Sequence, residues 1–202
     1  MIRIFLETGK KTTSEYVFIN TLMRHVLKVE ESEYSIDCVN GKDNLHNAAN
    51  KFISYSEDGD VNLIIFDADS PENNGGYNER KQTLTEEMQS YGIKADIFLF
   101  PNNKDDGDFE SLLESLMRID KHKTFVDCYS DYEKCLGHEY VAPNRKGKLF
   151  TYISAMPMSK TKRGKLGSSE WQFEDEEYWD LSNEYLQPLI SFLERHLAPI
   201  GR

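Results

Sequence analysis

The chain has 202 residues, of which 39% are hydrophobic and 12% aromatic, so we expect one domain built around one sizeable core. Its formal net charge of −11 argues against indiscriminate nucleic-acid binding, but not against a nuclease whose positive charge is concentrated locally. No apolar run approaches the roughly 18 residues of a membrane span, and the three cysteines lack zinc or disulfide spacing, which predicts a cytoplasmic protein that makes no membrane contact.

The amino-terminal part of the chain predicts a strand followed by a helix. Residues 1–6 are apolar and run into Glu7 and a polar, glycine-containing stretch, as a strand does when it ends in a turn. Thr12 and Glu15 have the spacing of a capping box, and apolar side chains recur at helical intervals as far as Leu27. We therefore expect the first helix to begin near Thr12 and to pack one face on a sheet.

The same alternation continues along the chain. We expect strands over residues 34–38, 63–67 and 95–100, and helices over residues 45–55 and 79–91. Strands that alternate with helices favour a parallel sheet, because helical crossovers join parallel strands. The predicted fold class is therefore α/β, with a mostly parallel central sheet flanked by helices and a C-terminal helical extension.

Acidic side chains follow the expected strands at the end where open α/β sheets gather their chemistry. Glu7 follows the first strand, and Asp67 and Asp69 close the third. The two aspartates would point to the same side if the strand continued through both. Neighbouring carboxylates repel one another, and a hard cation such as Mg²⁺ or Mn²⁺ relieves the repulsion. We predict a metal site at Glu7, Asp67 and Asp69; a solvated Asp-Ser-Pro turn is the alternative.

Further candidate groups come from the second half of the chain. A helix is expected over residues 109–117, with Glu110 in its first turn, where an acid either compensates the helix dipole or serves as a further ligand or base. Lys146 and Lys148 are candidates for stabilising a pentacoordinate phosphorus, although a solvated surface charge is the ordinary role of a lysine.

The remaining elements are predicted from weaker patterns. Residues 121–136 are expected to form a helix, and residues 149–156 a strand or a short helix. Residues 159–169 are expected to form a mobile loop, and residues 175–197 a helix that bends or breaks near Pro188. The aromatic side chains of this last stretch are typical of a core or of a homodimer contact.

Residues 145–165 form a basic segment. No acidic residue occurs between residues 141 and 169, where the positive charges are Arg145, Lys146, Lys148, Lys160, Lys162, Arg163 and Lys165. Such a segment predicts contact with the phosphate backbone of DNA or RNA.

The strand-end glutamate followed later by Asp67-x-Asp69 resembles the topoisomerase–primase (Toprim) domain. The chain is similar to uncharacterised stand-alone Toprim-like bacterial proteins over residues 65–71, 75–76, 98–103, 106–110 and 143–148. The resemblance covers residues 1–155 and implies a Toprim/Rossmann-like fold, with Glu7 as the general glutamate and Asp67 and Asp69 as metal-binding aspartates. Glu110 matches a later acidic position of some Toprim nucleases. Thr8 departs from the family, in which a glycine usually follows the glutamate directly.

This resemblance implies a Toprim-like domain over residues 1–156 and a basic loop and C-terminal helix over residues 157–202 packed on the same domain. The expected activity is Mg²⁺- or Mn²⁺-dependent hydrolysis of a DNA or RNA phosphodiester. A non-catalytic Toprim-like module that binds nucleic acid or protein is the main alternative. A haloacid-dehalogenase-like phosphatase, with the first aspartate as nucleophile, and a Mn²⁺-dependent nucleotide-sugar transferase are two further alternatives.

Overall fold

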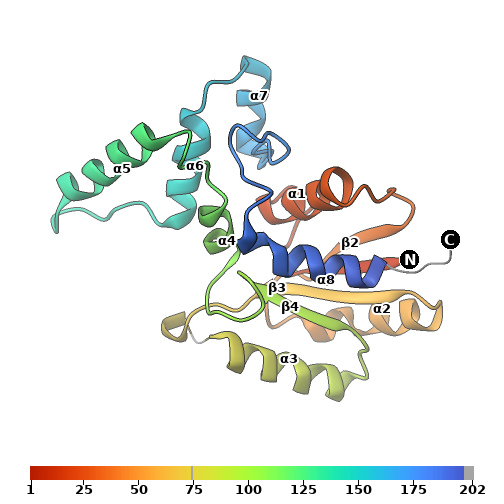
Figure 1. Ribbon diagram of the computed structural model, residues 1–202. Coiled ribbons are helices and arrows are strands. Elements are labelled where there is room, and N and C mark those ends of the chain that lie inside the picture. The colour runs from red at the N-terminus through yellow and green to blue at the C-terminus, as the bar shows by residue number, and fades with distance from the viewer. Residues whose placement is uncertain (74, 198–202) are drawn as a thin grey trace.

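The computed structural model describes residues 1–73 and 75–197, four segments of which form one parallel sheet in the order β2-β1-β3-β4 (Figure 1). The strands are β1 (Ile2–Leu6), β2 (Tyr34–Cys38), β3 (Val61–Asp67) and β4 (Asp96–Phe100). The predicted α/β class with a parallel central sheet flanked by helices is confirmed.

Helices and short turns make up most of the rest of the described chain. The helices are α1 (Ser14–Thr21), the π-helical η1 (Leu22–Val26), α2 (Leu45–Glu57), α3 (Tyr77–Tyr91), α4 (Phe109–Ser115), α5 (Lys123–Leu136), α6 (Arg145–Ala155), α7 (Lys160–Lys165) and α8 (Gln187–Leu197). The 3-10 turns are η2 (Pro71–Asn73), η3 (Leu166–Ser168) and η4 (Glu184–Leu186). None of the helices in these residues is long and apolar enough to cross a membrane.

Helices cover both faces of the sheet (Figure 1). Helices α2 and α3 pack on the face that carries Ile64 and Phe66 of β3. Helices α1, α4 and α8 pack on the opposite face, which carries Leu63 and Ile65. Because side chains alternate along a strand, Asp67 continues the row of Leu63 and Ile65. Its side chain therefore points toward the layer that contains α1 and α4.

Local sequence explains where α1 and α4 begin. Thr13 is the N-cap of α1 and accepts a hydrogen bond from the Tyr16 amide at 3.4 Å, so the capping box expected from Thr12 to Glu15 is wrong by one residue. Asp108 caps α4 by accepting from the Ser111 amide at 2.7 Å. These caps satisfy amides that have no partner inside the helix.

Three expectations for the second half of the chain need correction or refinement. Residues 149–155 belong to α6, which starts at Arg145 because Asn144 caps it and is followed by the extended Met156. Residues 159–169 are not a loop, since α7 begins after the N-cap Ser159. The last helix begins only at Gln187, and Pro188 lies in its first turn, where a missing amide hydrogen costs no hydrogen bond.

The backbone of residues 170–183, before η4 and α8, is irregular. Its aromatic side chains fill the core and do not line one face of a helix. The Trp179 indole donates to the Trp171 carbonyl at 2.8 Å, and both rings are buried. Phe192 of α8 packs against Phe98 of β4 with ring centroids 5.4 Å apart. The expected C-terminal extension thus packs on the same sheet as β1–β4; residues 198–202 of that prediction lie outside the described residues.

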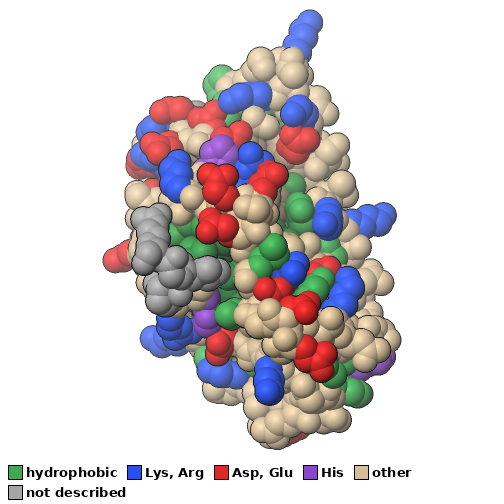
Figure 2. Space-filling view, turned by 90° about the vertical axis from the view of Figure 1, so that its right-hand side faces the viewer, with side chains coloured by type: hydrophobic (Ala, Val, Ile, Leu, Met, Phe, Trp, Pro, Cys, Tyr) green, Lys and Arg blue, Asp and Glu red, His purple; other side chains and the backbone are tan. Residues whose placement is uncertain are grey.

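The face of the molecule seen in Figure 2 carries acidic and basic side chains interspersed with apolar ones. No broad basic patch is drawn on that face.

Candidate functional site

The central strands β1 and β3 bring two of the predicted acids to the same edge of the sheet. Leu6, the last residue of β1, pairs with Ile65 of β3, so Glu7 follows β1 close to the point where Asp67 ends β3. The strand order reverses between β1 and β3, since β2 lies beyond one and β4 beyond the other. Open α/β sheets bind their ligands at the carboxyl ends of strands at such a reversal.

A pocket of about 420 Å³ lies at this edge. Four carboxylates line it, those of Glu7, Glu15, Asp67 and Glu110, together with the ammonium-bearing side chain of Lys146. They come from five different places in the fold: the β1 end, α1, the β3 end, α4 and α6. The geometry therefore brings together Glu7, Asp67, Glu110 and Lys146 of the predicted set and adds Glu15.

The first residue of α4 fixes the Asp67 side chain by a hydrogen bond. Oδ1 of Asp67 accepts a hydrogen bond from the Phe109 amide at 2.8 Å. Burial raises the pKa of Asp67 well above its ordinary value, the negative charges of Glu15 and Glu7 raise it further, and the Phe109 amide opposes the shift. A positive charge close to Asp67 would lower its pKa and favour its ionised form.

Glu7 and Glu15 each carry a buried carboxylate oxygen without a hydrogen-bond partner, namely Oε2 of Glu7 and Oε1 of Glu15. Burial, with the charges of Glu7 and Glu110, raises the pKa of Glu15 to about 8. Burial also raises the pKa of Glu7, and the Arg80 guanidinium, whose Nη2 lies 3.9 Å from Oε2, opposes that shift. Buried carboxylate oxygens without a hydrogen bond are costly, so a positive charge close to these two would stabilise them.

Asp69 takes a different position from the one its spacing suggested. Strand β3 ends at Asp67, and Asp69 has a φ of +59°, so the backbone leaves the extended conformation before it. The Asp69 carboxylate lies 3.5 Å from Lys42 Nζ, its carbonyl accepts from the Gly107 amide at 2.8 Å, and its side chain is not among those that line the pocket. The condition for the two aspartates to share a side is therefore not met.

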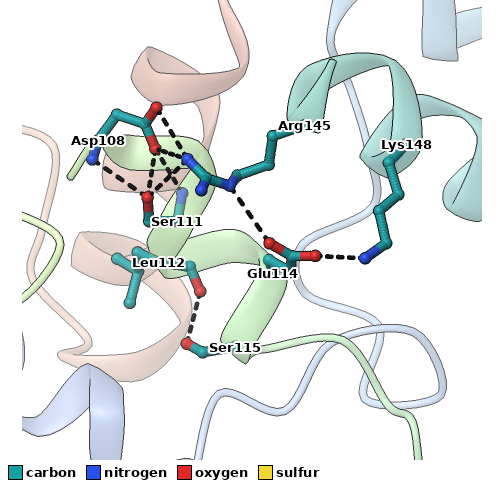
Figure 3. Close-up of polar contacts among 7 residues, drawn as sticks. All are labelled: Asp108, Ser111, Leu112, Glu114, Ser115, Arg145 and Lys148. Atoms are coloured by element: carbon teal, nitrogen blue, oxygen red, sulfur yellow. Dashed lines mark hydrogen bonds and ion pairs between the residues drawn. The ribbon is translucent and has the colours of Figure 1, made fainter. Parts of the chain in front are cut away.

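The two predicted lysines also separate. Lys146 lines the pocket with its Nζ 3.4 Å from Glu110 Oε1. Lys148 instead pairs with Glu114 on α4, outside the pocket lining (Figure 3). Arg145 also pairs with Glu114, with its Nε 3.2 Å from that carboxylate, and its Nη1 lies 3.0 Å from Asp108.

The basic segment of residues 145–165 is largely paired within the molecule. Lys162 lies 2.9 Å from Asp175, and Lys165 lies 3.0 Å from Glu170. Arg163 donates to backbone carbonyl groups, including that of Met156 at 2.9 Å. Much of the charge that suggested a nucleic-acid surface thus neutralises nearby acids, which leaves Lys146 as the positive side chain lining the acidic pocket.

Sequence patterns did not single out Glu15, Arg80 and Lys42 as residues of the site. Glu15 looked like a capping residue because acids are common in the first turn of a helix. Arg80 lies on a polar helix, where nothing in the pattern marks it as buried, yet only 6% of it is exposed. For Glu15 and Arg80 the informative observation is burial of a charge, and for Lys42 it is the ion pair with Asp69; both require the fold.

Comparisons with protein-family models, with curated proteins and with solved structures found no match for the chain. The pocket is therefore interpreted from its own chemistry. Its donors are carboxylate oxygens, the ligands preferred by Mg²⁺ and Mn²⁺, and two of them lack a hydrogen-bond partner. Over residues 1–73 and 75–197, no group of three or more His, Cys, Asp or Glu side chains is already arranged to hold a metal ion.

Proposed function

We propose that this chain is a divalent-cation-dependent phosphodiesterase that acts on DNA or RNA. Glu7 and Asp67 hold the cation, and Glu110 and Lys146 act beside it. The observation that carries this proposal is the pocket at the β1–β3 edge, in which four carboxylates meet and two buried oxygens have no hydrogen-bond partner. The resemblance of the chain to Toprim domains points to the same chemistry.

The donor set fits a hard cation in type, while the positions of the side chains call for a small adjustment. Glutamate side chains rotate about three bonds, so Glu7 can turn toward Asp67 without a change in backbone. Cation binding is favoured because burial disfavours the charged form of both carboxylates. A bound Mg²⁺ or Mn²⁺ polarises a phosphate group and lowers the pKa of water.

The side chains of the chain itself supply the remaining steps. Lys146 pairs with Glu110 at 3.4 Å and can exchange this partner for a phosphate oxygen of the substrate. Glu110 is then free to accept a proton from the water that attacks phosphorus. As the new P–O bond forms, the bond to the leaving oxygen breaks, and that oxygen takes a proton from solvent. Lys146 stabilises the negative charge that builds up on phosphorus.

A non-catalytic module is the second candidate, and one observation favours it. Lys146, Arg80 and Lys42 already face Glu110, Glu7 and Asp69, so the acids are partly neutralised within the chain. Such a protein would bind nucleic acid or a protein partner without turnover.

A cleavage assay separates the two candidates. End-labelled single- and double-stranded DNA and RNA are incubated with the protein and Mg²⁺ or Mn²⁺, with a chelator in parallel reactions. We expect cation-dependent cleavage that falls by about 10²-fold or more in Lys146→Met, as for removal of a group that stabilises a transition state. Asp67→Asn should be equally impaired.

Lys148→Met is the matched control, because it removes the same charge from the same helix but outside the pocket. It should cleave much better than Lys146→Met. Binding of nucleic acid without cleavage under either cation would favour the non-catalytic module, and cleavage that survives Asp67→Asn would place the reaction elsewhere.

A further inference from the structure

Glu15 does not behave like an ordinary first-turn acid. It is the second residue of α1, a position where acids commonly compensate the helix dipole while exposed to water. Glu79 occupies such a position in α3 and is exposed. Oε1 of Glu15 is instead buried without a hydrogen-bond partner, and Thr13 already caps the helix. Neither capping nor dipole compensation explains why this carboxylate is turned inward.

The surroundings of Glu15 are the acids of the candidate site. It lines the same pocket as Glu7, Asp67 and Glu110. Among the charged groups that raise the pKa of Asp67, Glu15 has the largest effect, ahead of Glu7. The carboxylate of Glu15 is therefore directed at the same small volume as that of Asp67.

Asp69 has a local structural role that accounts for its position. The Asp69 backbone pairs with Gly107, and its carboxylate faces Lys42. Residue 75 is packed so closely against Asp69 that a Cβ added to Gly75 would lie only 2.4 Å from the Cβ of Asp69. These contacts fix the loop after β3 with the Asp69 side chain outside the pocket lining. The Asp69 carboxylate lies 3.5 Å from Lys42 Nζ, whereas the buried oxygens of Glu7 and Glu15 have no hydrogen-bond partner.

We infer, on the basis of the cation site proposed above, that Glu15 is the third carboxylate ligand of that site, together with Glu7 and Asp67. Asp69 shapes the loop and is not a ligand. The three ligands come from α1 and from the ends of β1 and β3, so cation binding ties the first helix to the centre of the sheet.

Titration with MnCl₂ alone tests this assignment without any substrate. Isothermal calorimetry and the electron paramagnetic resonance signal of free Mn²⁺ are measured for the wild type and for Glu15→Gln, Asp69→Asn and Glu79→Gln. We expect Glu15→Gln to weaken Mn²⁺ binding by at least about tenfold, the lower end of the loss seen when groups around a metal are removed. Asp69→Asn and Glu79→Gln should bind Mn²⁺ as the wild type does.

Glu15→Asp completes the series, because it keeps the charge but shortens the side chain. It should bind Mn²⁺ more tightly than Glu15→Gln and less tightly than the wild type, and it remains informative if Glu15→Gln fails to fold. Mn²⁺ affinity that is unchanged in Glu15→Gln, or lost in Asp69→Asn, would overturn the assignment. A wild type that binds Mn²⁺ but cleaves no nucleic acid would instead contradict the proposed activity and leave the ligand assignment intact.

Discussion

Burial of the Glu15 and Asp67 carboxyl groups makes the stability of the fold depend on pH. The pKa of Glu15 is raised from 4.5 to about 8, and that of Asp67 is also raised, in both cases mainly by burial. Such an acid binds its proton more tightly in the folded chain than in the unfolded chain. The free energy of unfolding therefore falls as pH rises from the unfolded pKa to the folded pKa.

For Glu15 this window runs from 4.5 to about 8. We predict that the cation-free protein loses stability across it, by up to about 1.4 kcal/mol per pH unit for each such proton. Urea denaturation in chelator at a series of pH values measures the slope. Glu15→Gln should make the slope shallower because it removes one titrating group.

Glu79→Gln is the control for this experiment, because it removes an exposed acid that also lies in the first turn of a helix. Its stability should follow pH as in the wild type. A Glu15→Gln slope as steep as the wild-type slope would show that Glu15 does not carry the buried proton.

At the scale of the element, a row of ion pairs joins α6 to α4 (Figure 3). Arg145 bridges Asp108 and Glu114, Lys148 also pairs with Glu114, and Lys146 lies between the two on the same turn of helix. These pairs are only partly buried, and pairs of this kind contribute about 0.2–1 kcal/mol each. Their importance lies in positioning the start of α6 at the pocket.

We predict that Arg145→Met costs about 1 kcal/mol of stability, speeds hydrogen exchange in the first turn of α6, and lowers cleavage because Lys146 loses its position. Lys123→Met is the control, since it breaks an exposed pair with Asp127 within α5. Mass-spectrometric hydrogen exchange of both variants measures the effect. Hydrogen exchange in α6 that stays at the wild-type rate in Arg145→Met would show that these ion pairs do not position the start of α6.

The elements that could be predicted from the sequence were those with strong periodicity. Residues 34–38 coincide with β2, and residues 79–91 differ from α3 by two residues at the start. Helix α7 was missed because its six residues contain no apolar side chain, so Ser159 as the cap was the only local signal. The last helix was predicted too long because closely spaced aromatic residues imitate helical periodicity, whereas here they fill a core from irregular backbone.

At the scale of the whole molecule, the sequence located the edge of the sheet that carries the pocket but not all of its members. Glu7 and Asp67 follow from the rule that parallel strands present their carboxyl ends together. The direction of Asp69 depends on one backbone angle, its φ of +59°, which the sequence does not specify. Glu15 enters only because α1 packs against that edge, which is a property of the assembled layers.

The net negative charge of the molecule is consistent with an acidic pocket that attracts a cation. The chain carries −11, its basic segment is largely paired internally, and the pocket concentrates four acids with one lysine. A divalent cation would relieve the repulsion among these acids, which is why cation binding and folding stability should be linked.

Diffraction from crystals grown with MnCl₂, recorded near the manganese absorption edge, tests the central claim most directly. The predicted result is an anomalous difference peak in the pocket within coordination distance of Glu7 and Asp67. A pocket without such a peak in crystals that bind Mn²⁺ elsewhere, or a peak centred on Asp69 and remote from Glu7, would contradict it.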